Sequence, residues 1–307
     1  MAFTAKDVAE LRKQTGCGMM DCKRALEEAN GNMAEALKVL REKGMAATAK
    51  KQSRIAAEGV VDVLTVGNTT AMIEVNSETD FVAKNETFRT FVRGVLETII
   101  ATRPATVEEL MTKTMGDGQT VEAALQEKTF TIGEKLNLRR FVVVDGVVST
   151  YIHGGGSTGV IVAFAADEAA VANDGFAEFA KNIALQVAAL PAQYVAREDV
   201  PASVIEEERA ILIKQMEQDP KMAGKPEKVL AGIVNGKLGK FYEANCLLEQ
   251  GYVKEDSMTV AKYVAATAKE FGAAIAITAF YRFDKGEGIA KREENFAEEI
   301  AKMVKKD

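Results

Sequence analysis

The chain has 307 residues, of which 47% are apolar and 27% charged, and its net charge is −6. This length and apolar content are sufficient for a large core and for two or more domains. The sequence contains no run of 18 apolar residues and is acidic overall, so we expect neither a membrane span nor DNA binding.

The charge is unevenly distributed along the chain. Residues 1–54 hold 11 of the 39 basic residues and 7 of the 45 acidic ones, so their net charge is +4 and the remainder carries −10. A basic N-terminal segment can steer towards an acidic patch on a protein partner. A solvated helix surface explains the same charges equally well, and both interpretations stay open.

The cysteines and the N-terminus indicate a cytoplasmic protein. Cys17, Cys22 and Cys246 do not suggest a disulfide framework, and one histidine is too few to complete a zinc site with them. We expect small buried side chains instead. The chain enters a capped helix at residues 4–7, so we expect no signal segment.

The first predicted unit is a small helical bundle. Residues 4–43 have the apolar spacing of three short helices, and we expect Gly31 and Gly44 to mark helix ends. Residues 46–54 are small and basic, as in a linker. About 40 residues are marginal for an independent core, so this bundle should lean on another part of the chain.

A weak internal repeat follows the bundle. Residues 58–61 align with residues 145–148, and each copy continues through a glycine-containing turn into a second strand. A helix follows at 81–100 in the first copy and at 176–190 in the second. The repeat predicts a duplicated α+β core whose halves pack separately.

The pattern changes after residue 200 to two helical segments that begin at Pro201 and Pro226. Their apolar stripes contain Ile205, Leu212 and Met216 in the first, and Val229, Ile233, Val234 and Leu238 in the second. They predict an antiparallel helical hairpin that projects from the core and is a candidate homodimer contact. Residues 273–283 then return as a strand, and an amphipathic helix is expected from residue 288.

The turn at residues 153–159 contains two literal motifs, G-x-G-x-x-G and G-x-S-x-G. Phosphate binding by the first motif and nucleophilic catalysis by the serine of the second both require a helix directly after the turn. The run at 160–164 instead reads as a strand. The only histidine, His153, precedes Ser157 by four residues, so a hydrolase triad is not expected. The glycines should instead permit positive φ in a hairpin, or the close approach of a partner's backbone. His153 is either an exposed turn residue or a contact.

The junction between a strand at 71–75 and the helix at 81–100 contains the main candidate site. Ser77 and Asp80 form a Ser-x-x-Asp helix start signal, and Asp80 lies at the positive end of the helix dipole. Phe81, in the first helical turn, has two interpretations. It is either a buried core residue beside a cap, or an exposed aromatic wedge with a carboxylate beside it.

Several motifs resemble those of the elongation factor Ts family, in the family's order and across nearly the whole chain. They are Leu11, Arg12, Thr15, Gly16 and residues 18–23; residues 74–76 and 79–85; residues 132–134 with Arg139 and Arg140; His153 and Gly154; and Arg282, Phe283 and residues 286–288. The chain departs from the family pattern at residues 186–191. Gln186 stands where the family often has histidine, and Pro191 comes one place early.

The resemblance implies an α+β fold with antiparallel sheets and five parts. These are a three-helix domain similar to ubiquitin-associated domains, with its linker, at 1–54; a core N-subdomain at 55–140; a core C-subdomain at 141–199 and 251–285; a helical hairpin insertion at 200–250; and a C-terminal helical module at 286–307.

The resemblance also implies a guanine-nucleotide exchange factor for the translational GTPase EF-Tu in its GDP-bound or nucleotide-free form. Such a factor is not an enzyme itself, and we expect it to bind no cofactor, metal or nucleotide. The implied contact residues are Thr79, Asp80, Phe81 and Val82; Arg12, Met19, Met20 and Lys23; and Ile132, Gly133 and His153. The alternative is a translation-associated scaffold or RNA-associated protein that binds without altering nucleotide exchange.

Overall fold

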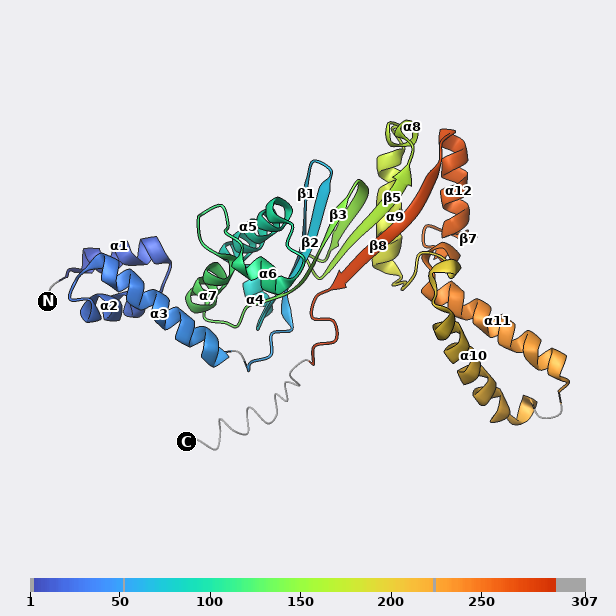
Figure 1. The fold of residues 1–307 in the computed structure, drawn as a ribbon, viewed down its shortest axis with the longest axis horizontal. Coiled ribbons are helices and arrows are strands. Elements are labelled where there is room, and N and C mark those ends of the chain that lie inside the picture. The colour runs from blue at the N-terminus through green and yellow to red at the C-terminus, as the bar shows by residue number, and fades with distance from the viewer. Residues whose placement is uncertain (1–2, 52, 223–224, 291–307) are drawn as a thin grey trace.

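The computed structural model of the chain describes residues 3–51, 53–222 and 225–290. A three-helix bundle projects from one end of the elongated molecule (Figure 1). Its helices are α1 (Ala5–Thr15), α2 (Met19–Glu28) and α3 (Met33–Lys51). The three predicted helices are confirmed, and Gly31 has the positive φ of a helix end, 84°.

The linker predicted at residues 46–54 and the helix end predicted at Gly44 are wrong, because α3 continues to Lys51. Alanine and lysine, which dominate this stretch, favour helix. Lys51 Nζ also donates a hydrogen bond to the Thr129 carbonyl oxygen, at 3.1 Å. Thr129 belongs to α7 (Val121–Ile132), so the extended helix ties the bundle to the core.

The bundle leans on α7, as its small size predicted. Phe130 of α7 packs against the bundle's own core. Gly44 of α3 lies against the same ring, since a Cβ placed there would be 3.5 Å from the Phe130 Cβ. Cys17 and Cys22 are buried in this core and Cys246 is buried elsewhere, all three as free thiols, which confirms the prediction of small buried side chains.

The first half of the core is a three-stranded antiparallel sheet with helices on one face. Its strand order is β1-β2-β3, with β1 at Glu58–Val66, β2 at Thr69–Ser77 and β3 at Asn137–Asp145. The covering helices are α5 (Glu86–Thr102), α6 (Val107–Thr112) and α7. Alternate strand residues such as Ile73 and Val75 pack against Phe88 and Val92 of α5.

The second half repeats this arrangement. Its sheet order is β4-β5-β8, with β4 at Val147–His153, β5 at Thr158–Ala166 and β8 at Ile275–Asp284. The sheet is covered by α9 (Phe176–Ala189) and α12 (Val260–Phe271), with the short α8 (Glu168–Val171) and the β6–β7 pair (Gly251–Tyr252, Glu255–Thr259) nearby. The predicted strand at 273–283, the helix at 176–190 and the α+β class are confirmed.

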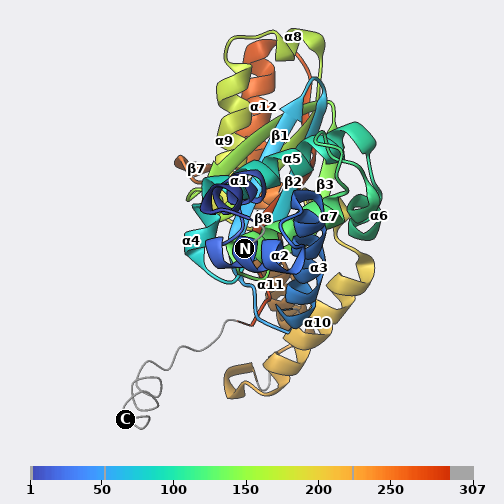
Figure 2. The same ribbon diagram turned by 90° about the vertical axis from the view of Figure 1, so that its left-hand side faces the viewer.

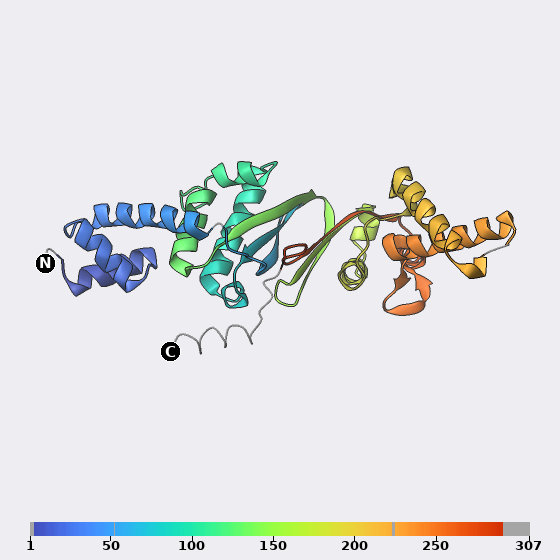
Figure 3. The same cartoon turned by 90° about the horizontal axis from the view of Figure 1, so that it is seen from below.

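The prediction that the two halves pack separately is wrong, because the sheets share a core between their facing surfaces. Met72 and Val61 of the first sheet meet Ile161 and Ala163 of the second. Each central strand is apolar on both faces, as expected of a strand buried on both sides. The layers therefore run from α5 and α7 through the two sheets to α9 and α12 (Figures 1 and 3).

The predicted helical hairpin is confirmed at the end opposite the bundle (Figure 3). It consists of α10 (Ala202–Glu217) and α11 (Glu227–Asn245), preceded by Pro201 and Pro226. Leu212 and Leu238 are buried between them as predicted, but Val229 is 46% exposed. The contacting row runs through residues 230, 234 and 238, and Val229 lies one position outside it.

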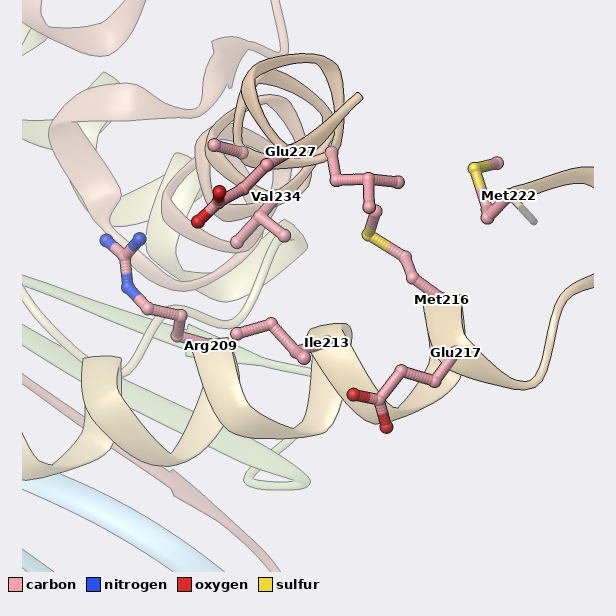
Figure 4. Close-up of a pocket in the computed structure, with 9 residues that line it drawn as sticks. Arg209, Ile213, Met216, Glu217, Met222, Glu227 and Val234 are labelled. Atoms are coloured by element: carbon pink, nitrogen blue, oxygen red, sulfur yellow. The ribbon is translucent and has the colours of Figure 1, made fainter. Parts of the chain in front are cut away.

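An open cavity of about 390 Å³ lies between the two hairpin helices, lined by side chains that include Ile213, Met216 and Val234 (Figure 4). The homodimer contact through this hairpin stays a prediction, as does the division into five parts, whose boundary at residue 140 falls inside β3. The helix predicted from residue 288 lies, from residue 291 on, outside the described residues. In the described ranges, no helix is both long and apolar enough to cross a bilayer.

Candidate functional site

Phe81 lies on α4 (Asp80–Ala83), a single helical turn, and its side chain is 78% exposed. The interpretation of Phe81 as a buried core residue is therefore wrong. The prediction of a single helix at 81–100 is also wrong, because the helix is interrupted between α4 and α5. Asn85 caps α5 by accepting hydrogen bonds from the backbone N–H of Thr87, at 2.8 Å, and of Phe88, at 3.3 Å.

The predicted Ser77–Asp80 start signal does not cap α4. Ser77 is buried and its hydroxyl donates to the Thr79 carbonyl oxygen, at 2.9 Å, while Thr79 itself occupies the N-cap position. Asp80 pairs with Lys84 at 2.8 Å. The hydrogen bond and the charge of Lys84 hold the pKa of Asp80 below its usual range, so this carboxylate is ionised at neutral pH.

Two loops bind each other at the base of α4. Glu134 accepts hydrogen bonds from Thr79, at 2.9 Å from its backbone N–H and 2.6 Å from its hydroxyl. Glu78 accepts in return from the backbone N–H of Lys135, at 2.6 Å. Gly133, with φ of 86°, ends α7 immediately before Glu134. The predicted contacts at residues 132–133 and 79–81 therefore lie beside two loops that are held together.

The loop before α2 adjoins the end of α7. The Cys17 Sγ lies 4.0 Å from the Thr131 Oγ1, which brings the loop between α1 and α2 onto α7. Met19 and Met20, in the first turn of α2, are 57% and 59% exposed, so the interpretation of one of them as core is wrong. Figure 2 shows α4 to one side of the bundle. Arg12, on α1, is exposed, and Lys23, on α2, is half-buried.

The glycine turn between β4 and β5 is linked to α4 through Arg89, which donates to the carbonyl oxygens of Ala83 and Gly155. Gly154, Gly155 and Gly156 have φ of 54°, 64° and 107°, as the sequence predicted. His153 at its start is exposed, and its Nδ1 lies 3.1 Å from the Tyr151 hydroxyl. Ser157 Oγ donates to the His153 carbonyl oxygen, at 3.1 Å, and β5 follows directly. The turn thus has neither the helix nor the serine–imidazole contact of a hydrolase.

The close approach that the glycines permit is to the chain's own β1, and no partner is needed to explain it. The Val61 N–H donates to the Gly156 carbonyl oxygen at 2.8 Å. A Cβ on Gly156 would lie 2.2 Å from the Val60 Cγ2, which no side chain tolerates.

Gly156→Ala is expected to lower the free energy of unfolding by about 3 kcal/mol, from the positive φ and the clash together. Gly155→Ala is the matched control, because its φ is also positive but a Cβ there meets only an Arg89 nitrogen at 3.9 Å. We expect Gly155→Ala to lower the free energy of unfolding by about 1 kcal/mol. Urea unfolding of both variants measures the difference, and equal losses would contradict the clash.

A buried carboxylate joins the two halves behind this surface. Glu74 of β2 is fully buried and accepts from Arg139 at 2.9 Å and from Arg140 at 2.7 Å. It also accepts from the Asn76 amide at 3.0 Å and from the Gly286 N–H at 2.8 Å. Gly286 follows β8, so one carboxylate connects both sheets.

The segment after β8 is held on both sides. The Lys285 N–H donates to the Ser157 carbonyl oxygen at 2.8 Å, and the Lys285 ammonium pairs with Glu58. Arg139 also donates to the Glu287 carbonyl oxygen. This network was not predicted from the sequence, although a lone glutamate inside the apolar strand at 71–75 was a signal for it.

Acid is expected to weaken this junction. Burial raises the pKa of Glu74, but the hydrogen bonds from Asn76, Gly286 and the two arginines together outweigh burial and lower that pKa. An unfolded glutamate titrates near pH 4.3, so below that pH the unfolded chain binds more protons than the folded one. The stabilisation is complete above the unfolded pKa and is lost as pH falls through the folded one.

Urea unfolding between about pH 6 and pH 3 tests this expectation. Glu74→Gln should lose less stability across that range than the wild type does, because its amide does not titrate. All other carboxylates are the same in both proteins. Parallel pH profiles would contradict the role of Glu74.

The surface that carries Met19, Met20, Phe81 and His153 consists of exposed apolar and polar side chains on short turns. Such an arrangement is suited to contact with another macromolecule. Among the described residues, no cluster of histidine, cysteine and acidic side chains could hold a metal ion. A family model described as Elongation factor TS matches residues 78–287. The chain therefore belongs to the elongation factor Ts family, translation elongation factors that act with EF-Tu. The bundle lies before the matched residues.

Proposed function

We propose that this protein is a guanine-nucleotide exchange factor that binds EF-Tu, GDP-bound or nucleotide-free, and accelerates release of GDP and Mg²⁺ in the cytoplasm. The observation that supports this proposal is the exposure of Phe81 on a single turn whose base is held by Glu134. An exposed aromatic ring that is held in a fixed position stabilises a complex when a partner buries it. The protein itself contributes no cofactor, metal or bound nucleotide.

The mechanism follows from linkage between two binding equilibria. If the factor lowers the affinity of EF-Tu for nucleotide, the nucleotide lowers the affinity of EF-Tu for the factor by the same ratio. Phe81 enters between elements of the GTPase domain behind the Mg²⁺ site. Asp80, ionised at neutral pH and paired with Lys84, competes in the polar network around that ion.

Phe81 cannot supply the whole effect. Moving a nucleotide site from nearly full to nearly empty takes a difference of about 5.5 kcal/mol. Burying one phenylalanine contributes about 1.5–3 kcal/mol. The remaining free energy comes from distributed contacts, with the second half of the core on another EF-Tu domain. We assign contacts to Arg12, Met19, Met20 and Lys23 on one side and to Ile132, Gly133 and His153 on the other.

Thr79 and Val82 differ from the other predicted contacts. The Thr79 hydroxyl and N–H are both occupied by Glu134, and Val82 packs in the core of the first half. These two residues anchor α4, so their contribution to binding comes through the position of Phe81.

Single-turnover release of fluorescent GDP from EF-Tu, with and without this protein, tests the proposal. We expect release to accelerate with the concentration of the factor and to saturate. A scaffold or RNA-associated protein would bind EF-Tu, or a ribonucleoprotein containing it, and leave the release rate unchanged. An unchanged rate in the presence of demonstrated binding would therefore overturn the proposal.

A further inference from the structure

We propose that Arg89 is a positioning residue that holds the Phe81 turn in register with the glycine turn that carries His153. The inference rests on the proposed exchange function, and it assigns to an exposed arginine a role that no motif indicated.

Arg89 bridges two backbone segments from different halves of the molecule. Its Nε donates to the carbonyl oxygen of Ala83, the last residue of α4, at 2.9 Å. Its Nη2 donates to the carbonyl oxygen of Gly155, at 2.7 Å. Only a planar guanidinium presents two donors in this fixed arrangement, so lysine cannot reproduce both bonds.

The bridge supplies a donor to the last carbonyl oxygen of α4. A helix of four residues is not stable alone. The backbone N–H groups of Lys84 and Asn85 donate to the carbonyl oxygens of Phe81 and Val82, and the Ala83 carbonyl oxygen accepts from Arg89. Glu134 holds the N-terminal end of α4 through Thr79, and Arg89 holds the C-terminal end through Ala83. Phe81 lies between these two anchors. Loss of Arg89 leaves the turn held only by Thr79 and the packed Val82, which lets the ring tilt.

The same guanidinium also binds the glycine turn. Three consecutive glycines have positive φ, and none of them has a side chain that could anchor the turn. The hydrogen bond from Val61 to Gly156 fastens one side of the turn, and the hydrogen bond from Arg89 to Gly155 fastens the other. Arg89 therefore sets the spacing between Phe81 and His153, two contacts that must reach EF-Tu together.

Hydrogen exchange in the free protein tests the bridge itself. Arg89→Met keeps an extended side chain but removes every donor. We expect amide exchange in peptides covering residues 81–85 and 154–158 to become about fivefold faster, as for loss of one net hydrogen bond. Arg93→Met is the matched control, since Arg93 lies one turn further along α5 and only approaches Glu97, at 3.9 Å. Unchanged exchange in both peptides would overturn the inference.

A double-mutant cycle tests the consequence for nucleotide release. Arg89→Met should slow EF-Tu-bound GDP release about tenfold in the otherwise wild-type factor, because small displacements of a positioned group have large effects on rate. In a Phe81→Ala background the same substitution should change the rate by less than about twofold, since the ring it positions is gone. A similar loss in both backgrounds would identify an independent contact and overturn the positioning role.

The two proposals fail in different ways. If the wild-type factor does not accelerate GDP release, both the proposed exchange function and the role of Arg89 in exchange are overturned. If the wild-type factor works and Arg89→Met works equally well, only the role of Arg89 is overturned. Arg89→Lys, which keeps one bond at most, should give an intermediate rate, which a purely structural surface arginine would not.

Discussion

Phe81→Ala is expected to reduce factor-stimulated GDP release by about 10- to 100-fold while leaving the fold as stable as before. Burying a phenylalanine contributes about 1.5–3 kcal/mol, and each 1.4 kcal/mol corresponds to a factor of ten. In the free protein the ring is 78% exposed, so its removal costs little packing. The free energy of unfolding should therefore change by less than about 0.5 kcal/mol.

Single-turnover release at a factor concentration below saturation measures the first effect, and urea unfolding measures the second. Val66→Ala is a control, because Val66 is also an exposed apolar residue, at the end of β1, but has no proposed contact. Undiminished release by Phe81→Ala would remove the wedge from the mechanism. A large loss of stability would instead mean that the ring supports the fold.

Glu74→Ala is expected to show the opposite combination, a large loss of stability from a residue that no partner reaches. Removing the carboxylate leaves Arg139, Arg140 and the Gly286 N–H without their shared acceptor. Breaking a buried ion pair costs about 3–5 kcal/mol. The two arginine side chains are 25% and 30% exposed and regain some hydration, so we expect about 3 kcal/mol.

Urea unfolding measures this loss directly. Glu97→Ala is the matched control, because Glu97 is exposed and lies 3.9 Å from Arg93 on the same helix. That variant should stay within about 0.5 kcal/mol of the wild type. If Glu74→Ala matched the control, the buried network would contribute nothing to the junction between the halves.

Elements with strong local signals were predicted well. The hairpin helices begin beside Pro201 and Pro226, and α9 follows a long apolar period, so local sequence was sufficient for them. The break between α4 and α5 was missed because Asn85 caps a new helix without disturbing the apolar period. The shared core between the sheets was missed because strands apolar on both faces lose the alternation that shows which face is buried.

The candidate site was predictable only in part, for a related reason. Residue types and motifs indicated Phe81, but its exposure depends on Glu134 and Arg89, which are distant in the sequence or on another element. Glu74 pairs with Arg139, Arg140 and the Gly286 N–H, which lie 65 to 212 positions away from it. Pairing over such separations leaves no periodic trace along the chain.

The strand order of the second sheet has a consequence for synthesis of the chain on the ribosome. β5 lies between β4 and β8, and residues 167–274 are made before β8 begins. Until β8 emerges, one edge of β5 stays without its neighbour, and an unpaired edge invites pairing with other chains. The first sheet is complete by Asp145, so the nascent protein carries one finished half and one open edge through more than a third of its translation.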